Sequence, residues 1–101
     1  MVQRYIHKAF LIDKLKFDLR IYVLLCGVDP LRVYFYNEGL CRLATQEYKA
    51  PAGNNLNNMF MHLTNYAINK FSDKFEKNSG GDKDEVGHKR SLTFAMRYID
   101  E

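Results

Sequence analysis

The alternation of apolar and polar side chains is clearest over residues 16–25, KFDLRIYVLL. A period of two residues is typical of a β-strand with one buried face. We expect a single strand here, and its buried face is expected to carry Phe17, Leu19, Ile21, Val23 and Leu25. On the other face Asp18 stands between Lys16 and Arg20, about 6 to 7 Å from each, so its carboxylate is expected to reach both cations. Most strand faces of this kind are solvated and hold one weak ion pair, worth about 0 to 1 kcal/mol.

Two further strands are predicted after this one. Residues 27–30 form a turn that contains Gly and Pro, and residues 31–36 resume the alternation. The expected inward side chains of this second strand are Leu31, Val33 and Phe35. A turn at residues 37–39 leads to a third strand at residues 40–45. The pattern therefore predicts an antiparallel β-meander, the smallest sheet that is stable with one hydrophobic face.

The two ends of the chain carry weaker patterns. Residues 2–6 form a β-prone run, and the apolar residues 10–12 extend it before a turn at Asp13. Ser91 is placed to cap a last helix. One apolar stripe of that helix is expected to consist of Leu92, Ala95, Met96 and Ile99.

The stretch between the strands and the last helix has the composition of loops. Residues 46–58 are rich in Asn with Pro and Gly, which predicts a loop with one helical turn near residues 56–60. Residues 61–70 mix polar and aromatic side chains without a clean period. Residues 71–87 combine a pair of glycines with many charges, which is typical of a mobile surface loop. The chain as a whole is therefore expected to be α+β, an antiparallel β-meander with a few short helices.

Composition narrows the class of protein. At 101 residues the chain is one domain or a piece of one, and a hydrophobic fraction of 47% excludes general disorder. Seven Tyr and seven Phe favour sheet. A net charge of +3 mildly favours an acidic partner, but nucleic-acid-binding proteins carry denser basic patches. No apolar run approaches the roughly 20 residues of a membrane span, so neither nucleic acid nor membrane is an expected partner.

Local motifs for common chemistries are absent from the sequence. It contains no phosphate-binding loop, dinucleotide motif or HExxH motif. His7, His62 and His88 are scattered, so each is expected to be structural or solvated, and no metal site is predicted. Cys26 and Cys41 form no CxxC motif and fall in predicted strands, which favours reduced, packed thiols in a cytosolic setting.

Four short sequence motifs occur in the order QRYI, KFDLR, EGLCR and HLTN, and they resemble motifs of a known protein family. Together with their surroundings over residues 2–71, they are similar to consecutive blocks of the tubulin-tyrosine-ligase-like family, and most similar to its polyglutamylases. Residues 72–101 resemble the family weakly.

The resemblance implies an ATP-grasp core, in which two sheet-bearing lobes hold ATP, and an ATP-dependent ligation of glutamate to glutamate side chains of tubulin tails. In such enzymes ATP phosphorylates a protein carboxylate, and the amino group of free L-glutamate then displaces the phosphate. The reactants are crowded with negative charge, so preorganised Arg and Lys side chains would stabilise them.

The resemblance also assigns roles to residues of this chain. Arg20 matches a catalytic position that meets the transferred phosphate or the acceptor carboxylate. The nucleotide-binding positions are Gln3, Arg4, Tyr5, Ile6, Lys16, Phe17, Asp18, Thr64 and Asn65. The substrate-binding positions are Arg42, Tyr66, Ala67, Lys89 and Arg90, of which Arg42 is expected to hold the incoming glutamate with its planar guanidinium.

The sequence departs from the family pattern at three positions. Ala9 stands where the family usually has Pro, Ala67 replaces a frequent Ser, and Ser91 stands where a third basic residue is expected. The Mg²⁺ ligands of the family are expected beyond Glu101, and its phosphate-covering lysines before Met1. Residues 1–101 are therefore expected to be the central segment of a catalytic domain, with a mobile loop at residues 72–90 and no activity when isolated.

The expected partners are acidic tubulin tails and free L-glutamate, in the cytoplasm at the microtubule cytoskeleton, with the cilium or flagellum as one location. Two alternatives remain open. One is ligation of tyrosine or glycine in place of glutamate. The other is a non-catalytic module that binds tubulin or microtubules, for which the positive charge is the sequence support.

Overall fold

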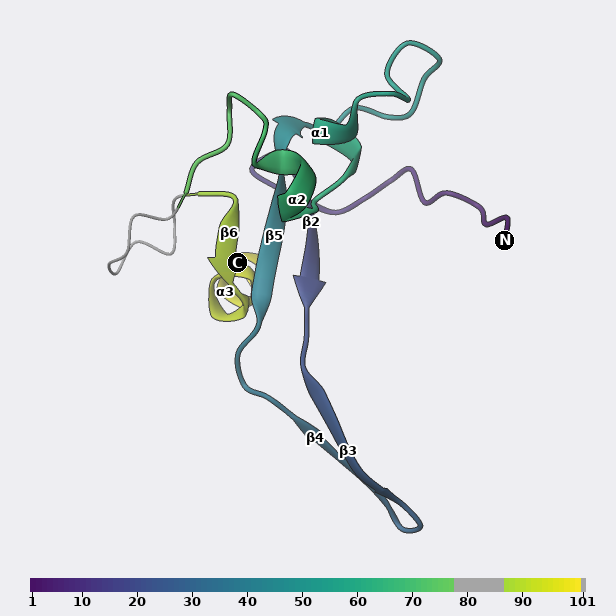
Figure 1. Ribbon diagram of the computed structural model, residues 1–101, viewed down its shortest axis with the longest axis vertical. Helices are drawn as coiled ribbons and strands as arrows, with labels where there is room; N and C mark the ends of the chain where they lie inside the picture. The colour runs from purple at the N-terminus through teal and green to yellow at the C-terminus, as the bar shows by residue number, and fades with distance from the viewer. Residues whose placement is uncertain (78–86, 101) are drawn as a thin grey trace.

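The computed structural model describes residues 1–77 and 87–100. The elements follow one another as β1 (Leu11–Ile12), β2 (Leu15–Arg20), β3 (Val23–Val28), β4 (Leu31–Phe35), β5 (Leu40–Glu47), α1 (Met59–His62), α2 (Tyr66–Asn69), β6 (Lys89–Ser91) and α3 (Leu92–Asp100). Antiparallel strands with short helices confirm the α+β class (Figure 1).

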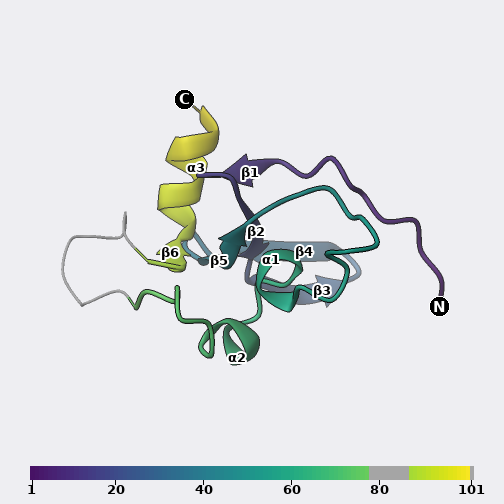
Figure 2. The ribbon, with the colours of Figure 1, turned by 90° about the horizontal axis from the view of Figure 1, so that it is seen from above.

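The main sheet of the described part has the strand order β1-β2-β5-β6, with every neighbouring pair antiparallel. Its register sets Leu19 opposite Cys41 and Phe17 opposite Leu43. One face packs against α3, and the short helices α1 and α2 contact the sheet from the other side (Figure 2). The sheet is therefore the middle layer of this part of the chain.

The hydrophobic core lies between the sheet and α3. Its buried side chains are Ile12, Cys41, Leu43 and Ala95, and Leu15, Phe17, Leu19, Phe94 and Tyr98 pack against them. The inward orientation predicted for Phe17 and Leu19 is confirmed. Burial raises the pKa of the Cys41 thiol to about 11, in agreement with the inert packing predicted for it. The packing predicted for Cys26 is wrong, because Cys26 is exposed.

The prediction of one continuous strand at residues 16–25 is wrong. The chain leaves β2 at Arg20 and begins β3 at Val23, because β2 pairs with β5 whereas β3 pairs with β4. Strands β3 and β4 form a separate two-stranded sheet, hereafter the β3–β4 hairpin, which projects from the main sheet (Figure 1). The three-stranded meander is also wrong, since β5 follows β4 in sequence but pairs with β2.

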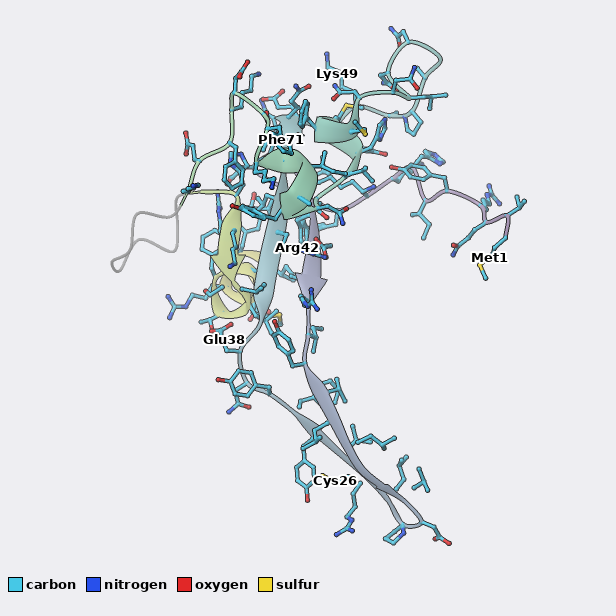
Figure 3. All side chains as sticks on the ribbon, viewed as in Figure 1. Met1, Cys26, Glu38, Arg42, Lys49 and Phe71 are labelled. Carbon is cyan, nitrogen blue, oxygen red and sulfur yellow. The ribbon has the colours of Figure 1, made fainter. Side chains whose placement is uncertain are left out.

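The inward faces predicted for the hairpin are exposed. The residues concerned are Ile21, Val23, Leu25, Leu31, Val33 and Phe35, whose side chains are 43 to 69% exposed. Figure 3 shows side chains on both sides of the hairpin, Cys26 among them, beyond the end of the main sheet. The alternation identified strands correctly, but it did not show which strands would be covered.

The remaining elements confirm some predictions and correct others. Residues 2–6 are extended without strand pairing, and β1 falls instead in the apolar segment at residues 10–12. The helical turn predicted near residues 56–60 appears as α1, slightly later in the chain, and α2 lies in the stretch that showed no period.

The last helix begins as predicted, since the Ser91 hydroxyl accepts a hydrogen bond from the Phe94 N–H at 3.1 Å. Its predicted stripe is only partly right. Ala95 is buried, but Met96 and Ile99 are 45% and 42% exposed, and Phe94 and Tyr98 pack against the core in their place.

The predicted loop at residues 72–90 overlaps β6, so Lys89 and Arg90 belong to a paired strand. Residues 78–86, with the carboxylates Asp82, Asp84 and Glu85, lie outside the described residues. In the part of the chain that the structure describes, no helix is long and apolar enough to cross a membrane.

Candidate functional site

Charged side chains form a row across three strands of the main sheet. Asp18 of β2 lies opposite Arg42 of β5, and Arg42 lies opposite Lys89 of β6. Side chains that face each other in register share one face of a sheet, here the face away from the core. Arg20 is two residues beyond Asp18 on β2, so it lies on the same face. The sheet thus gathers one carboxylate and three cations from positions that are far apart in sequence.

The Asp18 carboxylate pairs with Arg42 rather than with the neighbours predicted for it. The Arg42 Nε donates to Oδ1 at 3.0 Å and to Oδ2 at 3.2 Å, and Nη2 also donates to Oδ2. Burial opposes ionisation, but hydrogen bonds from Arg42 and Thr64, with the charges of Arg42 and Arg20, lower the pKa of Asp18 below its usual value. Asp18 is therefore an ionised group that fixes the orientation of the Arg42 guanidinium.

A cavity of about 340 Å³, hereafter the cationic cavity, opens on this face of the sheet. It is lined by Arg20, Leu40, Arg42, Leu43, Thr64, Tyr66, Asn69, Phe75, His88 and Lys89. Residues of β2, β5, β6 and α2 therefore meet at one site. Five of the residues predicted for a site from the sequence are among them: Arg20, Arg42, Thr64, Tyr66 and Lys89.

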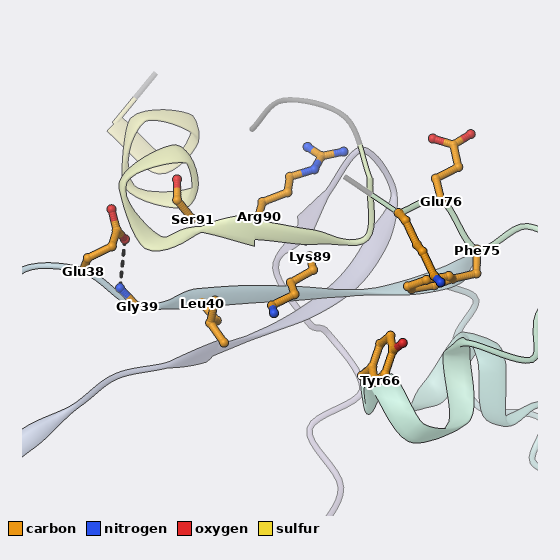
Figure 4. A pocket seen from close by; sticks show the side chains of 10 residues that line it. Glu38, Gly39, Leu40, Tyr66, Phe75, Glu76, Lys89, Arg90 and Ser91 are labelled. Carbon is orange, nitrogen blue, oxygen red and sulfur yellow. Dashed lines mark hydrogen bonds between the residues drawn. The ribbon is translucent and has the colours of Figure 1, made fainter. Parts of the chain in front are cut away.

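A neighbouring hollow of about 490 Å³ shares Leu40, Tyr66, Phe75 and Lys89 with the cationic cavity. Figure 4 shows this hollow, with Lys89 and Arg90 pointing to opposite sides of β6. The shared walls make the two spaces parts of one cleft, with Lys89 at the boundary between them.

Arg90 lines the larger hollow but is held mainly by contacts toward α3 and β1. Its Nη1 donates to Asp13 Oδ2 at 3.2 Å, and its Nε donates to the Gly87 carbonyl at 2.9 Å. Its guanidinium lies 4.6 Å from the centre of the Phe94 ring. Of the two cations predicted to bind substrate, Lys89 lines both spaces, while Arg90 joins β6 to the core side of the sheet.

The residues predicted for the adenine hinge form a third hollow. It measures about 400 Å³ and is lined by Gln3, Arg4, Tyr5, Ile6, Ala9 and Lys16. The Lys16 ammonium donates to the Tyr5 hydroxyl at 3.1 Å and lies 5.1 Å from the centre of its ring. Burial raises the pKa of Tyr5, but the neighbouring Tyr48 phenol, the hydrogen bond from Lys16 and the Lys16 charge lower it below its usual value. Six of the nine predicted nucleotide residues are thus divided between this hollow, hereafter the hinge hollow, and the cationic cavity.

Four predicted site residues line none of these spaces: Phe17, Asn65, Ala67 and Asp18, which pairs with Arg42. Phe17 packs against the core and meets Phe10 edge to face at 6.2 Å. Asn65 and Ala67 are exposed. The Asn65 carbonyl instead accepts the backbone N–H of Asn69 at 3.0 Å, at the start of α2.

Sequence reasoning missed Asn69, which is 1% exposed and lines the cationic cavity. Its side-chain oxygen accepts from the Thr45 N–H at 3.2 Å and from the Thr45 hydroxyl at 2.9 Å. Its amide nitrogen donates to the Leu63 carbonyl at 2.8 Å. Asn69 therefore fixes α2 over β5. No spacing rule could have found it, because Thr45 is 24 residues away in sequence.

His88, expected to be structural or solvated, lines the cavity as well. Its Nδ1 accepts the Glu76 N–H at 3.0 Å, and its ring stacks on Phe75 with centroids 5.8 Å apart. Burial, with the nearby Arg90 charge, lowers the pKa of His88 despite the opposing effect of Glu76. The neutral imidazole therefore holds residues 75–76 against the start of β6.

In residues 1–77 and 87–100, no group of three His, Cys, Asp or Glu side chains is placed to hold a metal ion. The lining of the cationic cavity includes cations, hydroxyl groups and aromatic rings. Such a set suits an anionic organic ligand.

Comparison with known proteins gives a consistent result. Residues 1–101 match the Tubulin-tyrosine ligase family. The chain is 54% identical over its whole length to the "Probable beta-tubulin polyglutamylase" of Tetrahymena thermophila, of which it covers 8%. It is 50% and 44% identical, over 98% of its length, to "Tubulin polyglutamylase TTLL13" and "Tubulin polyglutamylase TTLL7" of Mus musculus, of which it covers 12% and 10%. The chain thus spans about a tenth of the length of these curated relatives.

Proposed function

The chain belongs to the tubulin-tyrosine ligase family, and from this premise we propose that it serves in an ATP-dependent ligase that adds glutamate to glutamate side chains of tubulin tails. The observation that carries the proposal is the cationic cavity, in which Arg20, Arg42 and Lys89 converge from three adjacent strands. The names of the relatives at 44 to 54% identity support glutamate as the amino acid and tubulin as the acceptor.

The charges of the cavity suit these substrates. Free glutamate brings two carboxylates and an acidic tail brings more, so ligation needs cations that are already in place before the substrates arrive. The pairing of Arg42 with Asp18 keeps the guanidinium plane fixed, and its remaining N–H groups can form charge-assisted bonds with a substrate carboxylate. Arg20 and Lys89 supply positive charge from either side.

ATP, when bound, would supply the phosphoryl group that activates the acceptor carboxyl. The hinge hollow fits part of such a ligand, because it combines the cations Arg4 and Lys16 with an aromatic ring and a backbone that is not engaged in strand pairing. Gln3, Arg4, Tyr5, Ile6 and Lys16 would hold the base and part of the phosphates. The antiparallel α+β architecture is compatible with one part of an ATP-grasp core, and the Mg²⁺ ligands are expected outside this chain.

The test uses the longest natural protein that carries this chain, hereafter the parent protein. It is incubated with tubulin, ATP, Mg²⁺ and isotopically labelled glutamate, and parallel reactions contain labelled tyrosine or glycine. We expect glutamate to be incorporated into tubulin tails, and the incorporation to stop when EDTA removes Mg²⁺. Incorporation of tyrosine or glycine instead would replace glutamate in the proposal and leave the ligase class intact.

The net charge of +3 supports a second candidate, a non-catalytic module that binds acidic tubulin tails. Binding of this kind would weaken as salt is added, since screening acts on exposed charges. It would also be unaffected by ATP. Salt-sensitive binding without incorporation of any amino acid would therefore favour the module. Either function would place the protein at microtubules, with cilia as one such location.

A further inference from the structure

The segment formed by residues 1–10 has no helix or strand, although it supplies most of the hinge hollow. In Figure 1 it runs outward from the sheet as an extended chain. Backbone without ladder hydrogen bonds keeps its position only where side chains fix it. The position of the hinge hollow therefore depends on the side chains that contact this segment.

Tyr48 makes one such contact from the end of β5. Its hydroxyl donates to the His7 carbonyl at 2.8 Å, while its own backbone N–H donates to the Lys14 carbonyl at 2.9 Å. Tyr48 is thus anchored to the turn between β1 and β2. Burial and the neighbouring Tyr5 phenol raise the pKa of Tyr48 to about 12, so its hydroxyl stays protonated and remains a donor at neutral pH.

The imidazole of His62 supports both tyrosines. It meets Tyr5 edge to face with ring centroids 6.4 Å apart, and Tyr48 in the same way at 6.3 Å. Its Nε2 lies 3.0 Å from the Asn55 carbonyl. A carbonyl can only accept, so this nitrogen carries the proton. The ring of His62 is therefore held in place from α1 and contacts both phenol rings.

The contacts form a chain from the sheet to the hinge. The Tyr48 hydroxyl fixes the backbone at His7, and the His62 ring links the Tyr48 ring to Tyr5, whose hydroxyl accepts from the Lys16 ammonium. We propose that Tyr48, supported by His62, is a positioning residue that holds the Gln3–Ile6 backbone and the Lys16 ammonium in place for a nucleotide. The identity of the ligand rests on the proposed function, whereas the fixing of the segment is a property of the chain itself.

The test compares the parent protein with its Tyr48→Phe variant, which keeps the ring and loses the hydroxyl. Tyr34→Phe is the matched control, because Tyr34 lies on the exposed β3–β4 hairpin. The first measurement, made without nucleotide, is the rate of limited trypsin cleavage after Arg4 and Lys8, with cleavage after Arg32 as the internal reference. The second is the Kd for ATP by titration calorimetry.

For Tyr48→Phe we expect cleavage after Arg4 and Lys8 to become severalfold faster while cleavage after Arg32 is unchanged. The Kd for ATP should rise by about three- to tenfold, the effect of one lost hydrogen bond. Tyr34→Phe should change neither quantity. Unchanged cleavage after Arg4 and Lys8 would overturn the proposal, and so would faster cleavage at all three sites.

Two further outcomes separate this inference from the function on which it rests. Faster cleavage with an unchanged Kd for ATP would overturn the positioning role, because the segment would be fixed without serving the nucleotide. If the wild-type parent protein binds ATP and shows the expected response to Tyr48→Phe but transfers no glutamate, the proposed reaction fails and the inference holds.

Discussion

The main sheet and the β3–β4 hairpin are built from the same kinds of side chain and have opposite environments. Leu43 of β5 is 1% exposed, whereas Val33 of β4, which also lies in an alternating strand, is 43% exposed. The main sheet is covered by α3 on one face and by α1 and α2 on the other. The comparison shows that the pairing of strands and the covering of a sheet are separate events, and that burial depends on the second.

The largest expected difference between the two regions is the cost of a cavity. Leu43→Ala should lower the local opening free energy of β5 by about 2 to 5 kcal/mol, because a buried leucine leaves space that its neighbours cannot fill. Val33→Ala should cost less than about 1 kcal/mol in β4. Amide hydrogen exchange of the peptides covering each strand in the parent protein measures both quantities. Equal losses would mean that the hairpin is packed in the parent protein.

This contrast also explains what the sequence could and could not predict. Alternation correctly identified strands at Phe17 and Leu19, because it depends on neighbours two residues away. The same signal extended wrongly through Ile21, because the change of partner after Arg20 is set by β5, which lies twenty or more residues later. Local patterns cannot contain that information.

Some residues of the candidate site were predicted and others were not, because a local sequence pattern contains no information about partners that are distant in sequence. The resemblance found Arg20, Arg42 and Lys89, and the register then showed that they share one face of the sheet. Asn69 was missed, because it acts through a partner on another element. His88 was predicted to be structural or solvated, and its contacts with Glu76 and Phe75 are structural, but its place in the wall of the cavity was not predicted. The pairing of Asp18 with Arg42 was missed for the same reason as Asn69.

The second prediction concerns cations in the two regions. Arg42→Lys keeps the charge but loses the planar guanidinium that can bind a carboxylate with two hydrogen bonds. In the parent protein the KM for glutamate should therefore rise by a factor that corresponds to about 1 to 3 kcal/mol of lost binding free energy. The KM for ATP should change less. Arg32→Lys on the hairpin is the control and should leave both constants unchanged. Steady-state kinetics with each substrate varied in turn measures both KM values. Equal rises in the two KM values would show that Arg42 does not bind glutamate specifically.

A smaller effect is expected at Arg20, whose side chain is exposed although it lines the cationic cavity. Arg20→Ala should lower kcat by roughly 10-fold with little change in either KM, if its charge acts mainly as negative charge develops during transfer. Single-turnover measurement of glutamate transfer separates this step from binding. An unchanged kcat would show that Arg20 is an ordinary solvated cation on the strand face, without a role in the transfer step.

The pH dependence of the site should follow His88. Because its pKa is lowered in the folded chain, its contribution to stability is complete above the unfolded pKa of about 6.5 and is lost as the pH falls below that value. Protonation also removes the acceptor at Nδ1 that binds the Glu76 N–H. When the pH is lowered from 7 to 5, the amide hydrogen exchange of residues 72–77, corrected for intrinsic rates, should therefore accelerate more than the exchange of the β3–β4 hairpin. His88→Asn should reduce this difference, and its persistence in the variant would contradict the assignment.

The smallest effect is expected at the turn between β1 and β2, which belongs to the main sheet. Asp13 and Lys14 have positive φ angles of 51° and 63°, a backbone region that glycine adopts without steric cost. Asp13 is held there by the Arg90 ion pair, whereas the Lys14 side chain makes a 3.8 Å contact with Glu47 between two well-exposed side chains, and solvent screens such a pair. Lys14→Gly should therefore stabilise β1 and β2 by about 0.5 to 1 kcal/mol. Lys14→Ala is the matched control, since it removes the same ion pair and keeps the strain, and it should be neutral or slightly destabilising. Hydrogen exchange of the β1–β2 peptide measures both, and a loss of equal size in the two variants would show that the contact with Glu47 matters more than the backbone conformation.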